Sequence, residues 1–284
     1  MSALTVLSLS SSNLYGNIPS EMGKLSRLEF LQVSGNNLSG TIPAQLFNIS
    51  SIYLFAMAGN QLHGFIPPNI GNTLPNLRTL TLGGNMFAGS LPSSISNVSG
   101  LSQLDFSRNQ FTGHVPPNLG SLQDLVRLSL GENQLGTGEV DDLNFFTSLT
   151  NCSHLEVLAP TGNNLSGQLP DSIANLSTKL TKLYMGGNRI FGEIAPGIEN
   201  LVSLNGLAME NNLLTGSIPV LIGKLPNLVI VAMSGNQLSG KIPSNICNST
   251  RLEEIYFDRN RLQDQIPPSL GNCCKLRKSV TWQT

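Results

Sequence analysis

Apolar residues recur along the chain in a frame that repeats about every 24 positions. In residues 28–43, which read LEFLQVSGNNLSGTIP, apolar side chains stand at Leu28, Leu31 and Val33, and Asn36 follows three positions later. The alternation Leu31-Gln32-Val33 predicts a short strand with one buried face. Successive units begin at Leu4, Leu28, Ile52, Leu77, Leu101, Leu125, Leu155, Leu180, Leu204, Leu228, Leu252 and Leu276. Because one unit cannot bury its apolar face alone, neighbouring units must stack into one continuous core.

A period in the twenties with the frame L-x-x-L-x-L-x-x-N-x-L is typical of a leucine-rich-repeat solenoid. We therefore predict an α/β solenoid with a parallel β-sheet on its concave face. Parallel strands need crossover connections, which we expect as 3-10 or short helices on the convex face. A chain of this length often forms two domains, but the core of a solenoid grows with each unit. We expect a single solenoid over residues 1–284, with about 11 repeats and a truncated twelfth.

The ninth position of ten units is an asparagine. An inward amide side chain carries both donors and acceptors, so a stacked column can satisfy the backbone groups left open where each strand turns away. The predicted ladder comprises Asn36, Asn60, Asn85, Asn109, Asn133, Asn163, Asn188, Asn212, Asn236 and Asn260, and the first unit has Ser12 instead. In most units a glycine follows four positions later and permits the next bend. Asp264 replaces this glycine in the last full unit.

We expect both terminal caps of the solenoid to be missing. The first unit begins directly at Leu4, and Ser279 stands where the frame requires a leucine. Neither a signal peptide nor a membrane helix is recognisable in the sequence. These features indicate a fragment of a longer protein. Expressed alone, the chain should be poorly soluble or self-associate, and a stable monomer in sedimentation would contradict this expectation.

Composition and motifs argue against catalysis and against a nucleic-acid partner. Charged residues make up 12% of the chain, and the net charge is −1, so no polyanion or membrane surface is implied as a partner. His63, His114 and His154 occupy different positions in different units, and we expect them not to meet at one nucleophile or metal. Gly83-Gly84 and Gly186-Gly187 are interpreted as repeat turns. The H-R-D, D-F-G and V-A-I-K motifs of kinases are absent. We predict no enzymatic activity, cofactor or metal in this chain.

The four cysteines do not suggest a disulfide framework. Cys152 and Cys273 stand three residues before the first leucine of a unit, whereas Cys247 stands five before Leu252. We interpret these three side chains as small apolar fillers on the convex side. A framework would demand a proximity that this spacing does not suggest, and Cys274 receives no role.

Seven N-x-S/T sequons indicate passage through a secretory pathway. They lie at Asn37, Asn48, Asn97, Asn151, Asn164, Asn175 and Asn248. The alternative is that the repeat itself generates them, which applies to Asn37 and Asn164 because both lie in Asn-Leu-Ser-Gly. We expect the protein to be a glycoprotein.

The sixth unit is longer than the others and carries the insertion GTGEVDDLNFFTSL at residues 136–149. We expect Asp141 or Asp142 to cap a short helix, with Leu143, Phe146 and Leu149 facing inward at a spacing of three. The insertion is then a bulge packed on the convex or lateral side. A binding loop is the alternative interpretation.

The outward side chains of the strands form the candidate ligand face. In each unit the third, fifth, seventh and eighth positions face solvent on the concave side. At about 4.8 Å per strand, eleven strands give a face about 50 Å long, which suits an extended peptide. Exposed tyrosines and charges among neutral neighbours are typical anchors of an interface. The predicted ligand-binding residues are Asp105, Arg108, Arg127, Glu132, Lys182, Tyr184, Glu210, Tyr256 and Asp258. The alternative is that they are ordinary solvated charges, or that they pair across the sheet.

The full frame, L-x-x-L-x-L-x-x-N-x-L-x-G-x-I-P, resembles the ectodomains of plant leucine-rich-repeat receptor kinases. LTNCSHLEVL at 149–158 and GQLPDSIANLSTKL at 167–180 resemble subfamily XII, which includes receptors for bacterial elongation factor Tu and flagellin. The resemblance covers residues 1–276. It implies a right-handed superhelix and a receptor that binds a peptide or protein, and it implies a partner co-receptor kinase with a short leucine-rich-repeat ectodomain.

The resemblance further implies a place on the extracellular face of the plasma membrane and a role in detecting pathogen patterns. The whole receptor would add a signal peptide, a membrane helix and a cytoplasmic Ser/Thr kinase, none of which this sequence contains. A secreted binding protein without a kinase, such as a polygalacturonase inhibitor, is the alternative. Inhibitors of that kind have fewer units, and the long sixth unit favours the receptor.

Overall fold

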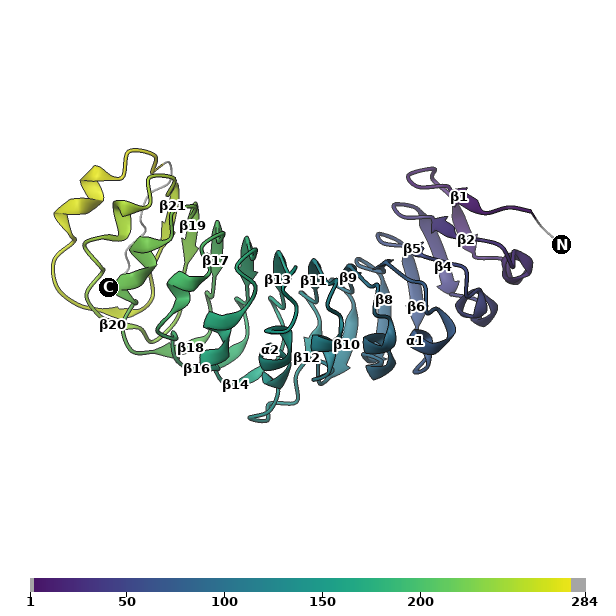
Figure 1. Ribbon diagram of the computed structural model, residues 1–284, viewed down its shortest axis with the longest axis horizontal. Coiled ribbons are helices and arrows are strands. Elements are labelled where there is room, and N and C mark those ends of the chain that lie inside the picture. Colours follow the sequence, from purple (N-terminus) through teal and green to yellow (C-terminus); the bar gives the residue numbers. More distant parts are fainter. Residues whose placement is uncertain (1–2, 277–284) are drawn as a thin grey trace.

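The computed structural model describes residues 3–276, which form a curved rod of stacked coils (Figure 1). An 11-stranded parallel sheet runs along the inner side of the arc, one strand from each unit. Its strands are β1 (Val6–Ser8), β3 (Phe30–Gln32), β5 (Leu54–Ala56), β7 (Thr79–Thr81), β9 (Gln103–Asp105), β11 (Arg127–Ser129), β13 (Val157–Ala159), β15 (Lys182–Tyr184), β17 (Gly206–Ala208), β19 (Ile230–Ala232) and β21 (Glu254–Tyr256). The predicted α/β solenoid with a concave parallel sheet is confirmed.

The register of this sheet aligns equivalent positions of successive units. Leu7 pairs with Leu31, Leu31 with Phe55 and Phe55 with Leu80, so every strand position becomes a column along the rod. Columns of leucine point inward, and Leu28, Leu80 and Leu128 have no exposed surface. Burial of apolar area is the main term that stabilises each stack. The columns of outward side chains are left for the concave face.

A second set of strands on the other side of the coils was not foreseen from the sequence. β2 (Tyr15–Asn17), β4 (Asn37–Thr41), β6 (Gln61–Gly64), β8 (Met86–Ser90), β10 (Gln110–Gly113) and β12 (Gln134–Leu135) form a six-stranded parallel sheet. β14 (Ser166–Gln168), β16 (Arg189–Glu193) and β18 (Leu213–Thr215) form a three-stranded sheet, and β20 (Ser239–Gly240) pairs with β22 (Arg261–Leu262). The gap between β12 and β14 coincides with the long sixth unit.

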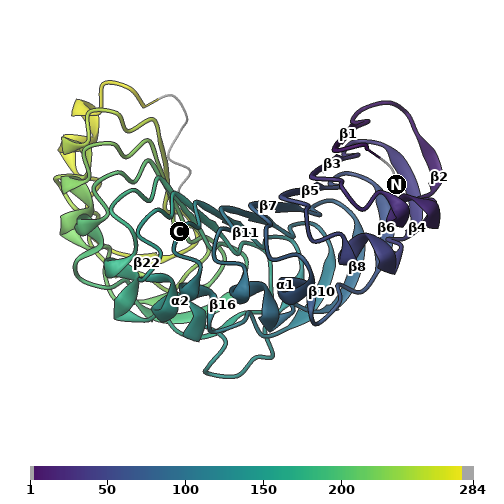
Figure 2. The same ribbon diagram turned by 45° about the vertical axis from the view of Figure 1, so that its right-hand side comes forward.

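Short helices cover the outer rim of the arc, as Figure 2 shows, and confirm the predicted convex layer. All nine 3-10 helices among residues 3–276 begin within three residues after a proline, whose fixed φ suits an entry into such a turn. They are η1 (Ser20–Lys24), η2 (Ala44–Asn48), η3 (Ser93–Asn97), η4 (Leu119–Ser121), η5 (Asp171–Asn175), η6 (Ile198–Asn200), η7 (Val220–Lys224), η8 (Ile246–Asn248) and η9 (Pro268–Asn272), beside α1 (Ile70–Thr73) and α2 (Asn144–Leu149).

The asparagine ladder is confirmed at all ten positions. In the Asn36 side chain, Nδ2 donates to the carbonyls of Leu9 and Val33 at 2.8 and 2.9 Å, and Oδ1 accepts from the amide of Leu14 at 3.0 Å. The nine other ladder residues repeat these bonds with the preceding unit. The ladder thereby ties each coil to the one before it. The glycine that follows adopts a left-handed φ, for example 76° at Gly40 and 104° at Gly64, and Asp264 keeps a φ of 81° in its place.

The expectation about the cysteines is wrong for one pair. Cys247 and Cys273 form a disulfide between the last two described coils, with Cα atoms 5.0 Å apart. They occupy different positions of their units, but each directly adjoins or lies within a convex 3-10 helix, η8 or η9, and the stacking of the coils brings these helices together. Cys152 is the buried filler that was expected, and burial raises the pKa of its thiol to about 11.

The sixth unit contains the expected short helix, but neither Asp141 nor Asp142 caps it. Leu143 holds the cap position of α2, and no side chain bonds to the helix end. Asp142 is buried instead, and its carboxylate accepts from the backbone amides of Thr137, Gly138 and Ser166 at 2.9–3.1 Å. The predicted inward positions Leu143, Phe146 and Leu149 are all buried. The carboxylate thus bridges the gap between β12 and β14.

Asp142 also meets a histidine, a contact that sequence reasoning missed. His114 Nδ1 lies 3.2 Å from Asp142 Oδ1, and Asp141 lies close to both. Three backbone amides and the Thr137 hydroxyl already donate to the Asp142 carboxylate. We therefore interpret the contact as part of the packing of the insertion.

The first unit is the least covered part of the sheet, with Leu4, Val6 and Leu9 partly exposed. The expectation about Ser279 and the C-terminal tail falls outside the described residues. Within residues 3–276, no helix has the length and apolar character needed to cross a membrane.

Candidate functional site

The nine predicted ligand-binding residues all lie on the strands of the concave sheet or in the turns that follow them. Arg127, Lys182 and Tyr184 belong to β11 and β15, where pairing with the neighbouring strands holds them in register. Arg108 and Glu132 stand in the turns after β9 and β11. The structure therefore brings Asp105, Arg108 and Glu132 together at one hollow, whereas Arg127 does not line it. It also places Tyr184 near Glu210. Tyr256 and Asp258 lie apart from these, in the eleventh unit.

A shallow hollow of about 450 Å³ crosses this face over units three to seven. Its lining includes three predicted residues, namely Asp105, Arg108 and Glu132. The floor consists of residues that the sequence reasoning passed over, namely Ala58, Gly59, Gly83, Gly84, Ser107, Ser129, Gly131, Ala159 and Thr161. These residues could have been predicted from a pattern in the sequence, because small side chains fill equivalent outward positions in consecutive units. A small-residue floor lets the backbone of a ligand approach closely.

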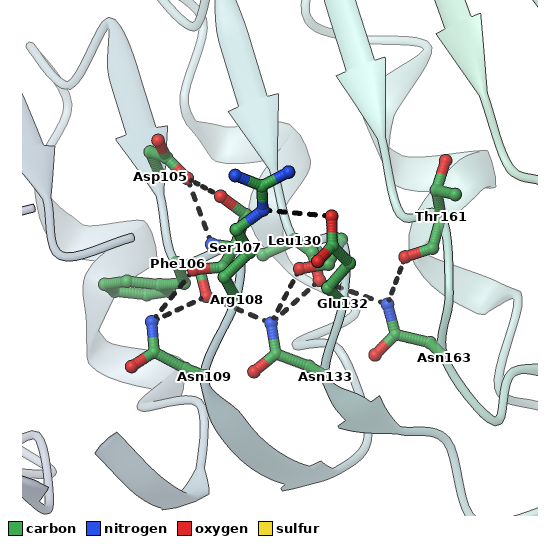
Figure 3. A network of polar contacts seen from close by, with 11 residues as sticks. Asp105, Phe106, Ser107, Arg108, Asn109, Leu130, Glu132, Asn133, Thr161 and Asn163 are labelled. Carbon is green, nitrogen blue, oxygen red and sulfur yellow. Dashed lines mark hydrogen bonds and ion pairs between the residues drawn. The ribbon is translucent and has the colours of Figure 1, made fainter. Parts of the chain in front are cut away.

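Arg108 and Glu132 form an ion pair at one side of the hollow, with Arg108 Nε 3.0 Å from Glu132 Oε1. Figure 3 shows the pair above the asparagine ladder. The two side chains are 70% and 61% exposed. An exposed pair of this kind contributes only about 0–1 kcal/mol to folding. Its main effect is to hold the guanidinium and the carboxylate in fixed places on the concave face. This agrees with the alternative that charges on adjacent strands pair across the sheet.

Asp105 is oriented by its own turn. Its Oδ1 accepts from the amide and the hydroxyl of Ser107, at 3.0 and 2.7 Å. This leaves Oδ2 with no hydrogen-bond donor among residues 3–276. The hollow therefore offers a fixed acceptor at Asp105 beside the Arg108–Glu132 pair.

The backbone at the ion pair is strained. Arg108 and Glu132 have φ angles of 53° and 56°, in the left-handed region. In the flanking units the same position is glycine, as at Gly59, Gly84 and Gly162. A side chain in this conformation costs roughly 1–2 kcal/mol. Strain of this sort often occurs at functional positions.

The backbone strain at Arg108 predicts the relative stability of two variants. Arg108→Ala and Arg108→Gly both remove the ion pair, but only glycine relieves the left-handed strain. Relief of about 1–2 kcal/mol exceeds the roughly 0.4–1 kcal/mol that glycine adds to the entropy of the unfolded chain. We expect Arg108→Gly to have the higher free energy of unfolding, by about 0.5–1 kcal/mol, in urea titrations. Equal stability of the two would show that the position is not strained.

Units eight and nine form a second group of predicted residues. Tyr184 lies across Gly206, because a Cβ built there would stand 2.5 Å from the tyrosine Oη. Partial burial, and then the negative charge of Glu210, raise the pKa of Tyr184. Tyr184 is therefore a neutral hydrogen-bonding group beside a carboxylate. Lys182 is exposed two residues before Tyr184, on the same face of β15.

The residues of unit eleven are satisfied within the chain. Tyr256 Oη donates to Glu254 Oε2 at 2.9 Å. The hydroxyl of Ser234 donates to Asp258 Oδ1, and Arg259 Nε donates to Asp258 Oδ2 at 3.1 Å. The Ser234 bond, and then the Arg259 bond, hold the pKa of Asp258 below its ordinary value of 3.8. These groups have less capacity left for a ligand than Asp105 has.

The lowered pKa of Asp258 gives stability a pH dependence. The unfolded chain protonates at the higher pKa, so the contribution is complete above about pH 3.8 and is lost as pH falls through the folded-state pKa. Ser234→Ala should lower the free energy of unfolding by about 1–2 kcal/mol at pH 7. The difference should shrink at pH 3, as measured by urea unfolding. In an Asp258→Asn background it should not depend on pH over this range.

The sequons lie at accessible positions. Asn37, Asn48, Asn97, Asn151, Asn175 and Asn248 are exposed, and Asn164 is half-buried. Glycosylation itself stays a prediction.

The family model described as Leucine Rich Repeat matches residues 3–25, 27–49, 76–98, 100–122, 179–201, 227–249 and 251–273, which is more than half of the chain. Among curated relatives, the chain is 46% identical over 89 residues to the LRR receptor-like serine/threonine-protein kinase EFR of Arabidopsis thaliana. That alignment covers 31% of this chain and 9% of the receptor.

Solved structures match over nearly the whole chain. The plant peptide hormone receptor RGFR1, in complex with RGF2, superposes with a TM-score of 0.85 at 32% identity, over 99% of this chain and 48% of that one. The Arabidopsis receptor kinase HAESA, in complex with the peptide hormone IDA and the co-receptor SERK1, superposes with a TM-score of 0.77 at 28% identity, over 99% and 50% of the two chains. The chain is thus similar to about half of a peptide-binding ectodomain.

Proposed function

The chain belongs to the leucine-rich-repeat family, and from that premise we propose that it is the ligand-binding extracellular region of a plant receptor-like Ser/Thr kinase. Its ligand is a peptide or protein that lies along the concave face. The observation that carries this proposal is the hollow over units three to seven, where a small-residue floor is flanked by Asp105 and the strained Arg108–Glu132 pair. The similarity to receptors titled as peptide complexes supports it.

The finer parts of the proposal rest on the resemblance to subfamily XII. The receptor acts in pathogen-pattern recognition and defence signalling, at the extracellular face of the plasma membrane, and it recruits a co-receptor kinase on binding. The relative at 46% identity and the co-receptor in the HAESA complex support this view. The secreted-inhibitor alternative has less support, because the similar proteins named above are receptors. Kinase activity would reside in a part of the receptor outside these repeats.

Selection of peptides by the purified chain tests the proposal. A phage-displayed library of random 12-residue peptides would be selected on residues 1–284, and the affinities of synthetic copies would then be measured. We expect micromolar or tighter binders that protect the strands around Arg108 and Glu132 from hydrogen exchange. An Arg108→Ala/Glu132→Ala double variant should bind at least about tenfold more weakly, which is about 1.4 kcal/mol. Selected peptides that bind only the convex helices would contradict the proposal.

Two peptide arrays would test the finer role. One array tiles abundant bacterial proteins, and the other carries small secreted plant peptides. We expect saturable binding to members of the bacterial array that the double variant loses. Binding confined to the plant peptides would leave the receptor proposal standing and would replace defence by hormone perception.

A further inference from the structure

The seventh position of the units carries small or hydroxyl side chains almost throughout. The column reads Ser10, Ser34, Ala58, Gly83, Ser107, Gly131, Thr161, Gly186, Glu210, Ser234 and Asp258. Only Glu210 and Asp258 in it are charged. Both carboxylates lie beside the seventh position of the preceding unit, but the neighbour is Ser234 for Asp258 and Gly186 for Glu210. The two carboxylates are therefore compensated differently.

Asp258 has its charge balanced within the chain, because Ser234 and Arg259 both donate to it. Glu210 has no such donor. Its Oε2 is shielded from solvent and accepts no hydrogen bond among residues 3–276, although the residue as a whole is half-exposed. Leaving a carboxylate oxygen without water or a donor costs more than leaving a neutral group unpaired. No lysine or arginine in the described part of the chain lies within ion-pair distance of it.

Glu210 and Tyr184 lie in neighbouring units of the concave face. The carboxyl group lies over Gly186, where an added Cβ would stand 2.4 Å from its Cδ and Oε1. Tyr184 is close enough for the charge of Glu210 to raise its pKa. Ala208 lies on the strand between them and is half-buried. A carboxylate, an aromatic ring and a small floor together favour a cationic group, which the carboxylate neutralises and the ring face attracts.

We propose that Glu210, Tyr184 and the backbone at Gly186 form a subsite for a cationic nitrogen group of the ligand, namely a guanidinium, a lysine ammonium or a peptide amino terminus. This subsite rests on the proposed function and extends it to the chemistry of the ligand. Glu132 lies three units before Glu210, a distance of about 14 Å at about 4.8 Å per strand. An extended peptide covers this distance in about four residues. The ligand therefore carries its cation about four residues from the part that contacts the Arg108–Glu132 pair.

The experiment compares peptide preferences of the wild-type chain and Glu210→Gln, selected on the same phage library of random 12-residue peptides. Glutamine keeps the size of the side chain and removes its charge. We expect the wild type to enrich arginine or lysine at one position of the aligned binders, and Glu210→Gln to reduce this enrichment at least about fivefold. Gly186→Ser is the second variant, because its Cβ would displace the Glu210 carboxyl group and its hydroxyl could donate to it, as Ser234 does to Asp258. It should weaken the same preference while the charge remains.

Glu254→Gln is the matched control, because Glu254 is also a carboxylate beside a tyrosine but already accepts from Tyr256. It should keep the wild-type enrichment. N-acetylated and free synthetic copies of the binders separate an amino terminus from a side chain as the source of the cation. Binders that lack a cationic preference, or that keep it in Glu210→Gln, overturn the subsite and leave the proposed function intact. A library that yields no binder to the concave face overturns both.

Discussion

Replacing Asn212 by alanine is expected to lower the free energy of unfolding by about 2–6 kcal/mol. The side chain is buried, and its Oδ1 accepts from the amide of Ile190 at 3.0 Å. Its Nδ2 donates to the carbonyls of Met185 and Met209 at 3.0 and 3.2 Å. Alanine would leave the Ile190 amide without this acceptor, at about 1–3 kcal/mol, and would remove two further hydrogen bonds, at about 0.5–1.5 kcal/mol each. The carbonyls of Met185 and Met209 keep their bonds from Asn188 and Asn236.

The loss of stability should first appear as local opening of the coils next to Asn212, before the whole chain unfolds. In a solenoid each unit contacts only its neighbours, so hydrogen exchange should accelerate first in units eight and nine. Asn200→Ala is the matched control, because this asparagine is exposed at the end of η6, and it should change stability by less than about 0.5 kcal/mol. If urea unfolding showed equal losses for the two variants, the ladder would not hold the coils together.

The second large effect is expected at Asp142. Its side chain is fully buried and accepts from the amides of Thr137, Gly138 and Ser166, as well as from the Thr137 hydroxyl. Asp142→Ala would leave these donors unpaired, and we expect a loss of about 3–5 kcal/mol in the free energy of unfolding. Since the carboxylate bridges the gap between β12 and β14, residues 136–143 should also become sensitive to limited proteolysis.

Asp141→Ala provides the control one residue away. Asp141 is exposed, and its carboxylate accepts no hydrogen bond from residues 3–276. We expect a change below about 0.5 kcal/mol and no new cleavage. Equal cleavage of both variants would mean that packing of Phe145 and Phe146, rather than the carboxylate, holds the insertion.

The fold could be predicted from the sequence because the pattern that indicates it is repeated in nearly every unit. The leucine columns, the asparagine ladder and the glycine bends each recur in nearly every unit, so one misread unit does not alter the conclusion. The outward positions followed as well, since a strand alternates its faces whatever the tertiary context. This placed Arg108, Glu132 and Glu210 on the concave face before any coordinates were known.

The partners of these side chains did not follow from the sequence. Arg108 forms an ion pair with Glu132, whereas Glu210 Oε2 accepts no hydrogen bond within residues 3–276. This difference depends on whether each side chain is directed toward the preceding or the following unit. The same holds for Cys247 and Cys273, whose unequal positions in their units argued against a bond that the stacked convex helices bring about. From the sequence alone, Asp142 was expected to cap a helix. In the structure its carboxylate connects the insertion to Ser166 at the start of β14.

The sequence by itself therefore determined the period, the buried columns and the face open to a ligand, because burial of repeated apolar positions leaves one stacking solution. Only the tertiary structure decided which charges are neutralised within the chain and which are not. Pairings such as Arg108 with Glu132, 3.0 Å apart, join residues one period apart in the sequence, and the register of neighbouring coils sets them.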